Sequence, residues 1–300
     1  MTRHGALCTL CSGVLLAAAV SPAAAADTAA QPSNGSYLGS RLLPGEPQGA
    51  CPPGIAPVYQ AYEIVTGTDM RQRPWGFAQT LREVLVKSSG DKRLRNDPRT
   101  VDLAAHADRL VACFRYADMM AETPLHDDQG TYDRPYRLTV TFDPAKIDAA
   151  LATLGDRPWR GARPVVVPLL LVRGRKPPPY LLDAENPLGA EQRGAFAVAA
   201  GQFGLKYRFP SEPELARWGA SAEHLPAEPP PSGDGEAVVG GTLDWSETLP
   251  GWIGNWHLRW ADGDHEWGVR GVNYDAAFRD IVSGVALIAS GNGAPGRAEP

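Results

Sequence analysis

Two short motifs have the spacing of known catalytic or cofactor sites, and neither has the context that such chemistry needs. Ser89 and Lys92 match the S-x-x-K pattern, which supplies the serine nucleophile of β-lactamases. The pair falls in a polar loop after a helical pattern, and no K-T-G follows it. Residues 291–296 match G-x-G-x-x-G, but they follow a predicted helix instead of joining a strand to a helix. We therefore predict no catalytic residue and no bound cofactor from these motifs.

Metal ligands are grouped at one place in the sequence. His257 is followed by Asp262, Asp264, His265 and Glu266, a set of side chains that can bind a divalent metal. The alternative is a hairpin turn, because Asp262-Gly263 is a strong turn pair and aspartates bond their own backbone there. His257 points to the side of its strand opposite Trp256. We expect the turn and no metal site.

Tryptophan is concentrated near the C-terminus, where five of the eight residues lie between Trp245 and Trp267. Trp252, Trp256 and Trp260 are four apart, so on a regular strand they share one face. Such a stripe either anchors a partner or forms the core beneath a helix. The core is the favoured interpretation, and Trp252, next to the loop, is the candidate partner-binding residue.

Four cysteines occur, and two of them lie in the N-terminal leader described below. Cys51 and Cys113 remain as an even pair that an oxidising compartment would join. A disulfide would close a loop of about 62 residues and contribute roughly 4 kcal/mol. The alternative, one buried and one exposed free thiol, stays open.

Residues 1–26 have the three parts of a secretory signal peptide. A positive start at Arg3 precedes an apolar run from Ala6 to Val20, and small residues end at Ala26. The run is too short to span a membrane as part of the mature chain. We expect cleavage after Ala26, a periplasmic or secreted protein and no mature transmembrane segment.

Composition and charge limit the class of protein. The chain has 300 residues and a formal net charge of −5, which argues against a nucleic-acid binder. Residues 157–176 carry six basic side chains and no acid, whereas residues 228–266 carry eight acids and one arginine. The two segments are either a dipolar surface turned toward anionic envelope material or solvated faces that attract each other.

Periodicity predicts an α+β or α/β fold with two small subdomains, β-α-α-β-α and then β-α-β-α-β-β-β-α. The first has strands at 58–66 and 137–142, and helices at 75–89, 103–114 and 144–154. The segment 155–164, rich in proline, glycine and arginine, is predicted to be a hinge that few contacts cross. In the second, strand 165–172 is apolar throughout, and Pro168 predicts an edge or a bulge within it.

The remaining elements of the second subdomain are short. They are a helix at 189–203, a strand at 206–209, a helix at 213–218, strands at 237–245, 252–260 and 266–270, and a helix at 274–289. The predicted domain boundaries follow: a signal peptide at 1–26, a flexible lead-in at 27–54, subdomains at 55–157 and 163–290, and a disordered tail at 291–300.

Several segments together resemble an uncharacterised family of bacterial envelope proteins, catalogued as domain of unknown function 2066. They are VYQAYEIVTG, LREVLVKSSGD, RPWRGARPVVVPLLLV, AAGQFGLKYRFPSE and the tryptophan-rich end, spread over residues 58–290. The order of elements in the second half is similar, by analogy of fold alone, to the N-terminal domain of TolB and to the CsgG group. The resemblance implies no catalytic residues.

The leading functional hypothesis is a non-catalytic periplasmic protein that binds an envelope partner, whether protein, lipid or glycan. Export and the missing catalytic motifs support it. One alternative is an exported hydrolase whose site is assembled from distant residues, such as Asp or His of the second half. Another is an assembly factor for an outer-membrane machine.

Overall fold

The computed structural model describes residues 51–122, 134–261 and 263–296. The predicted signal peptide, the lead-in as far as residue 50, Asp262 and the last four residues lie outside this range. Within it, the chain forms six α-helices and two sheets with nine strands, the expected α+β class. Both sheets belong to one compact unit of the chain.

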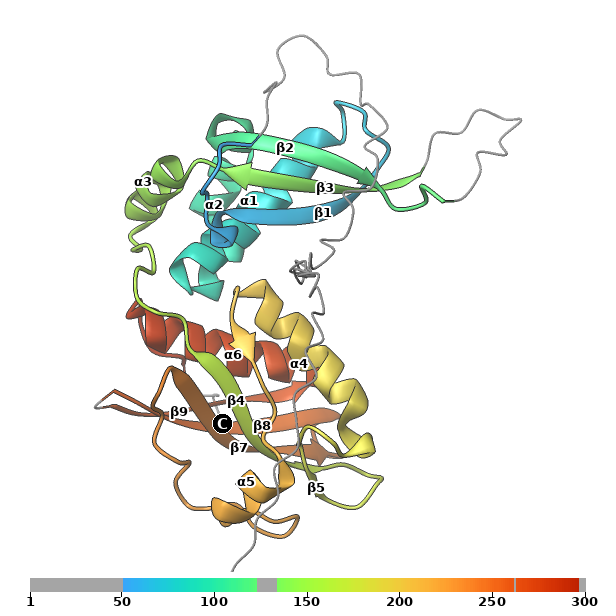
Figure 1. The fold of residues 1–300 in the computed structure, drawn as a ribbon, viewed down its shortest axis with the longest axis vertical. Coiled ribbons are helices and arrows are strands. Elements are labelled where there is room, and N and C mark those ends of the chain that lie inside the picture. The colour runs from blue at the N-terminus through green and yellow to red at the C-terminus, as the bar shows by residue number, and fades with distance from the viewer. Residues whose placement is uncertain (1–50, 123–133, 262, 297–300) are drawn as a thin grey trace, which may run out of the picture. The chain divides into compact units, whose positions relative to one another are not determined.

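The smaller sheet has three antiparallel strands in the order β1-β3-β2, and α1 crosses one of its faces (Figure 1). Its strands are β1 Gln60–Thr66, β2 Val111–Asp118 and β3 Pro135–Phe142. Its helices are α1 Arg73–Ser89, α2 Pro98–Ala104 and α3 Pro144–Leu154.

The helix boundaries of this half follow from local chemistry. The Asp143 side chain accepts hydrogen bonds from the backbone N–H groups of Ala145 and Lys146, so α3 begins at the predicted cap and proline. Helix α1 ends at Gly90, where φ is +83°. A Cβ at Gly90 would lie 2.7 Å from the carbonyl oxygen of Ala286, so both backbone angle and space require glycine.

The predicted helix at 103–114 is wrong. Helix α2 stops at Ala104, a 3₁₀ turn follows, and Val111–Asp118 is strand β2. The apparent helical spacing combined residues of different elements, because Leu103 belongs to the end of α2 and Phe114 belongs to β2. Beyond Val111 the side chains alternate, with Phe114 packing against the core, and pairing with β3 outweighs the local pattern.

The larger sheet has six strands, and its longest path is β5-β4-β7-β8-β9, with β6 paired to β4. Strand β4 runs parallel to β6 and β7, while β7, β8 and β9 are antiparallel. The strands are β4 Val165–Arg173, β5 Tyr180–Leu181, β6 Lys206–Tyr207, β7 Glu236–Ser246, β8 Gly251–Trp260 and β9 Gly263–Val272. The helices are α4 Ala190–Gln202, α5 Glu212–Arg217 and α6 Tyr274–Ser290.

Pro168 is accommodated by a gap in the pairing of β4. On one side β4 pairs with β7 along its whole length; on the other, β6 pairs only with Val165 and Val166, and β5 only with Leu171 and Val172. The carbonyl oxygens of Val166 and Leu170 accept bonds on this second side. Pro168 lies two residues from each of them, so its backbone nitrogen points to this same side. The N–H that proline lacks would therefore face the gap, and no bond between strands is lost.

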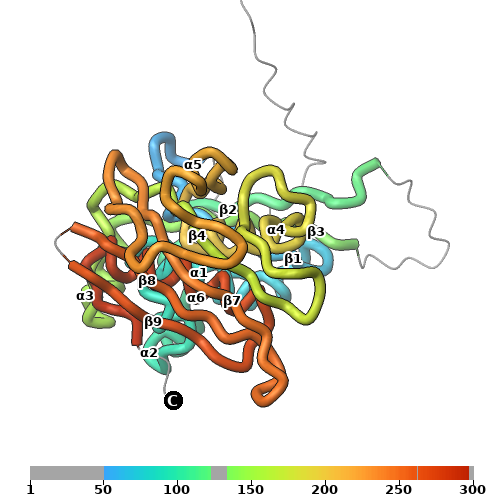
Figure 2. Tube along the Cα trace, turned by 90° about the horizontal axis from the view of Figure 1, so that it is seen from below, coloured from blue at the N-terminus to red at the C-terminus, as the bar shows by residue number. Residues whose placement is uncertain are grey.

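Helices cover the two faces of the larger sheet unequally. Helices α4 and α6 cover one face, and the cluster there includes Trp256 and Trp267 (Figure 1). The short helix α5 and the loop after it pack on the other face, where Leu215 contacts Val167, Leu169 and Val238 of β4 and β7. In Figure 2, seen from below, β7, β8 and β9 lie side by side, and α5 lies to one side of them.

Four 3₁₀ helices complete the described chain, and no described helix has the length and apolarity needed to cross a membrane. They are Pro57–Tyr59, Lys92–Asn96, Ala107–Leu110 and Pro187–Gly189. The strand β5 was not predicted, since two residues carry no periodic pattern.

Candidate functional site: a groove on the larger sheet

A groove of about 460 Å³ lies on the α5 side of the larger sheet. Its wall is the segment from Leu225 to Pro229, together with Leu169 of β4. Its floor is the part of β7, β8 and β9 that α5 leaves uncovered. Concave sites with an apolar wall and a few convergent polar groups are the usual place for a ligand, so this groove is the candidate site.

The floor is low because glycines occupy positions on β7 and β9, on either side of β8. A Cβ at Gly240 would come within 3.1 Å of the Cβ of Pro229 in the wall. A Cβ at Gly268 would lie 2.4 Å from the backbone oxygen of Gly254 on the next strand. Side chains at these two positions would push the wall and the strands apart, so glycine sets the depth of the groove.

Five polar side chains line the groove, and strand register places them together. Thr242 on β7 pairs with Asn255 on β8, and His257 on β8 pairs with Glu266 on β9. Arg270 lies further along β9. Paired residues share a face, so the three strands present these groups to one side.

Two side-chain contacts between charged or polar groups hold the rim of the groove. The ring of His257 contacts the carboxylate of Asp264 on the neighbouring strand. Arg259 donates to Glu228 at 2.9 Å and so ties the wall segment to β8. Arg259 and Asp264 are exposed, so these pairs add little stability and serve to position the groups.

The proposed metal ligands are only partly brought together. His257, Asp264 and Glu266 lie on the groove side, whereas His265 pairs opposite Leu258 and faces the other way. Across the described residues, no three ligating side chains gather closely enough to hold a metal. Asp262 lies outside this part of the chain.

The opposite face of the same strands is filled by tryptophan. A Cβ at Gly254 would lie 2.0 Å from the ring of Trp256, and one at Gly284 of α6 would lie 2.4 Å from the ring of Trp267. The glycines make room for these rings beneath α6. The groove therefore rests on a closely packed layer.

Trp252, Trp256 and Trp260 all pack against the helix-covered core. Trp256 is 2% exposed, and Trp252 is only partly buried. The Trp252 ring meets that of Trp245 edge-on, with centroids 5.6 Å apart, and Arg175 stacks on Trp245 at 4.8 Å. Trp252 thus sits in an aromatic cluster near the β7–β8 turn, outside the groove.

Cys51 and Cys113 form a disulfide, with Cα atoms 5.3 Å apart. Cys113 lies on β2, at 2% exposure, rather than on the predicted helix. The bond fastens the segment before β1 to the smaller sheet.

The predicted hinge at 155–164 is crossed by many contacts, which corrects that expectation. The backbone N–H of its Trp159 donates to the carbonyl oxygen of Ser88 at 2.7 Å. The Arg163 guanidinium donates to the carbonyl oxygens of Lys87 and Phe203 and stacks on the Trp159 ring at 4.1 Å. Burial lowers the pKa of Arg163 to about 10.

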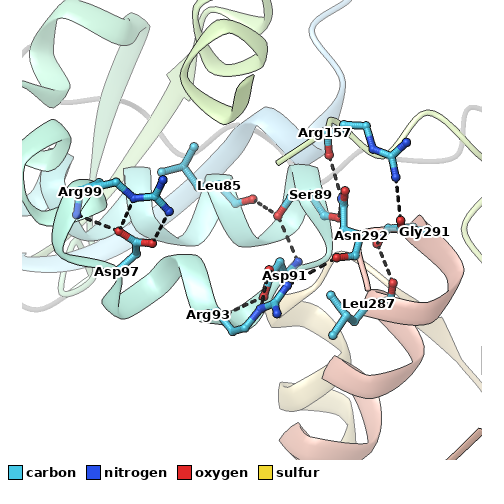
Figure 3. A network of polar contacts seen from close by, with 11 residues as sticks. Leu85, Ser89, Asp91, Arg93, Asp97, Arg99, Arg157, Leu287, Gly291 and Asn292 are labelled. Atoms are coloured by element: carbon cyan, nitrogen blue, oxygen red, sulfur yellow. Dashed lines mark hydrogen bonds and ion pairs between the residues drawn. The ribbon is translucent and has the colours of Figure 1, made fainter. Parts of the chain in front are cut away.

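A polar network joins the end of α1 to the end of α6 (Figure 3). The side-chain amide of Asn292 donates to the carbonyl oxygens of Ser89, at 2.7 Å, and Arg157, at 2.8 Å. Nearby, Asp156 has its Oδ2 buried without a hydrogen-bond partner. Burial raises the pKa of Asp156, and the charge of Asp91 raises it further.

The same region contains the S-x-x-K motif and the start of the G-x-G-x-x-G motif, and in both the residues have structural roles. Ser89 is fully buried, and its hydroxyl donates to the carbonyl oxygen of Leu85 and accepts from the Asp91 N–H. Lys92 pairs with Asp280 at 2.6 Å. Gly291, the first glycine of G-x-G-x-x-G, ends α6 at a φ of +72°. Ser89 and Lys92 thus serve structural contacts at the end of α1, and Gly291 caps α6.

The basic and acidic segments pair with each other in part. Arg173 bonds Asp244 at 3.0 Å, and Arg175 bonds Glu247 at 2.5 Å, each from the basic segment to the acidic one. These contacts favour the interpretation of two faces that attract each other.

A second hollow, of about 790 Å³, runs along α5. Its polar groups serve local turns: Asp183 accepts from the N–H groups of Glu185 and Asn186, and Asn186 accepts from that of Leu188. These bonds leave it a weaker candidate than the groove.

The groove could not be found in the sequence, because it depends on register. His257 was expected on the strand face opposite Trp256, which is where it lies. Thr242, Asn255 and Arg270 gave no pattern. The only sequence signal was the density of glycine in residues 240–271.

A search of curated proteins and of solved structures found no match to the chain. A family model does match residues 54–160, which include β1 through α3 and exclude the groove. Its description is a domain of unknown function, DUF8605. This agrees with the expected resemblance to an uncharacterised family, although the matched model is not the one numbered 2066. The N-terminal part of the chain is similar to DUF8605.

Proposed function

We propose that the protein is a non-catalytic envelope protein that binds its partner in the groove of the larger sheet. The observation that carries this proposal is the convergence of five polar side chains from three strands over a glycine floor. The wall supplies apolar contacts from Leu225 and Pro229. Such a surface can orient a partner by hydrogen bonds and exclude water along one side.

The location belongs to the same proposal. The leader at 1–26 favours export, and the Cys51–Cys113 disulfide suits an oxidising compartment. A periplasmic role, including that of an assembly factor for an outer-membrane machine, is part of this proposal. Trp252 remains a second candidate contact, as part of its aromatic cluster.

The His257–Asp264 pair favours one alternative, an exported hydrolase. A carboxylate that orients a histidine is part of many hydrolytic sites, with the histidine acting as general base. The contact described for His257 is with Asp264 alone, and Thr242 is the nearest hydroxyl by register. A binding role needs no nucleophile, so it accounts for the groove with fewer requirements.

Chemical crosslinking in the native envelope tests the proposal. Asn255→Trp fills the groove from an exposed position, and Val198→Trp on α4 is the matched control, since Val198 is 65% exposed. We expect Asn255→Trp to lose the captured partner and Val198→Trp to keep it. Equal capture by both variants would remove the groove from the account. A captured molecule that is cleaved by wild type and intact with His257→Ala would favour the hydrolase.

A further inference from the structure

Strand β9 lies at the open edge of the larger sheet. It is ten residues long, and in the strand order of the described chain nothing follows it. Its outer side therefore presents main-chain N–H and C=O groups that no described strand pairs. A long edge of this kind is a template for an added strand, one of the main ways in which proteins bind extended peptides.

The groove opens onto this same edge. Glu266, Gly268 and Arg270 line it, and all three belong to β9. They are two residues apart, so they point to one face of the strand. A strand added beside β9 would place every second side chain over the groove.

The groove face of β9 defines what such a strand would carry. Gly268 has no side chain, so a bulky residue of the added strand, placed beside Gly268, could reach across β9 toward Asn255 and the apolar wall. Glu266 and Arg270 flank that position and are both exposed. Cross-strand neighbours of opposite charge stabilise pairing, so the guest needs an acid opposite Arg270 and a base opposite Glu266.

A second copy of this chain fits less well. Antiparallel pairing of two β9 strands about Gly268 would match Glu266 with Arg270 of the other copy. It would also set glycine opposite glycine, so no side chain would enter the groove. A foreign peptide with a large central residue uses both the charges and the hollow.

We propose that the partner binds as an extended peptide that adds antiparallel to β9. Read along the peptide, an acidic residue comes first, a bulky apolar residue follows two positions later, and a basic residue follows after two more. Antiparallel pairing continues the arrangement of β7, β8 and β9 and is the more stable form. This inference rests on the proposed function, since it names the class of partner for the same groove.

Synthetic nonapeptides on an array test the pattern with the full mature protein. One peptide carries the order acid, phenylalanine, base at alternate positions, and its twin carries the two charges exchanged. A third is N-methylated at the alternate residues whose N–H groups would face β9, which removes the main-chain donors on that edge. We expect the first peptide to bind about tenfold more tightly than its twin, because two charge pairs reverse. The N-methylated peptide should lose binding.

The double variant Glu266→Arg with Arg270→Glu is the internal control, because it should prefer the exchanged twin. Equal binding of both peptides by wild type, binding that survives N-methylation, or no binding of any peptide would overturn the inference. The proposed function would still stand if Asn255→Trp abolished capture in the envelope. The proposed function itself would be wrong if Asn255→Trp captured its partner normally.

Discussion

The indole nitrogen of Trp256 on β8 donates a hydrogen bond to Oδ2 of Asp280 on α6, at 3.2 Å. The indole nitrogen of Trp267 on β9 donates to the backbone oxygen of the same residue, at 3.3 Å. Asp280 of α6 thus accepts a hydrogen bond from each of the two buried tryptophans. This arrangement fixes the helix over the strands whose other face forms the groove.

Removing the Trp256 ring should therefore cost much of the stability. We expect Trp256→Ala to lower the free energy of unfolding by roughly 3 to 5 kcal/mol, as loss of a large buried aromatic does. Trp252→Ala should cost less, since Trp252 is only partly buried. Thermal and denaturant melts compare the two, and envelope crosslinking shows whether Trp252→Ala weakens capture. An equal loss of stability in both variants would mean that the whole stripe is core.

Reduction of the Cys51–Cys113 bond should destabilise the fold. The bond closes a loop of 62 residues, so its loss should cost about 4 kcal/mol in the chain-entropy model. Melts with and without reductant measure the change, and Cys51→Ala should show no further effect of reductant. Non-reducing mass mapping should find one linked peptide pair. Two free thiols in protein from the periplasm would refute the bond.

Asp156 predicts a stability that falls as the pH rises. Its pKa is raised in the folded state above the ordinary 3.8, so the folded chain holds the proton more tightly than the unfolded chain. The stability from that proton is complete below 3.8 and is lost as the pH passes the raised value. Asp156→Asn stays neutral, so it should melt above wild type at pH 7, by a margin that shrinks toward acid.

Asp97→Asn is the control of opposite sign. A hydrogen bond from the Arg99 side chain lowers the pKa of Asp97, so its contribution is present at neutral pH and lost in acid. This variant should melt below wild type at pH 7, with a difference that closes as the pH falls. If Asp156→Asn also melts below wild type at pH 7, the assignment for Asp156 is wrong.

Export should remove the leader. N-terminal sequencing of the protein from the native host should begin at Asp27 or within a few residues. A full-length product in the cytoplasm would contradict the periplasmic role.

Much of the fold could be predicted where one element carries one pattern. The apolar run at 165–172 became the interior strand β4, and the amphipathic stretch at 274–289 became α6. Prediction failed at residues 103–114, where a helical spacing crossed an element boundary. Pairing of Cys113 and Phe114 with β3 decides that strand, and pairing is not a local property.

The groove could not be predicted for the same reason. Gly240 and Gly268 are far apart in sequence, and only the register of three strands makes them one floor. The loop at 226–235 was expected, but nothing in its composition shows that Pro229 lies over Gly240. A site made by the absence of side chains has no motif.

Site-specific photocrosslinking in the periplasm tests the central claim most directly. A small diazirine amino acid, photoleucine, in place of Asn255 lies in the groove without filling it as tryptophan would, and one in place of Val198 lies on the exposed side of α4. The account predicts a partner adduct from position 255 that Thr242→Trp, which fills the groove from the next strand, abolishes. Position 198 should give none. An adduct of equal yield from both positions, or one from position 255 that survives Thr242→Trp, would contradict a partner bound in the groove.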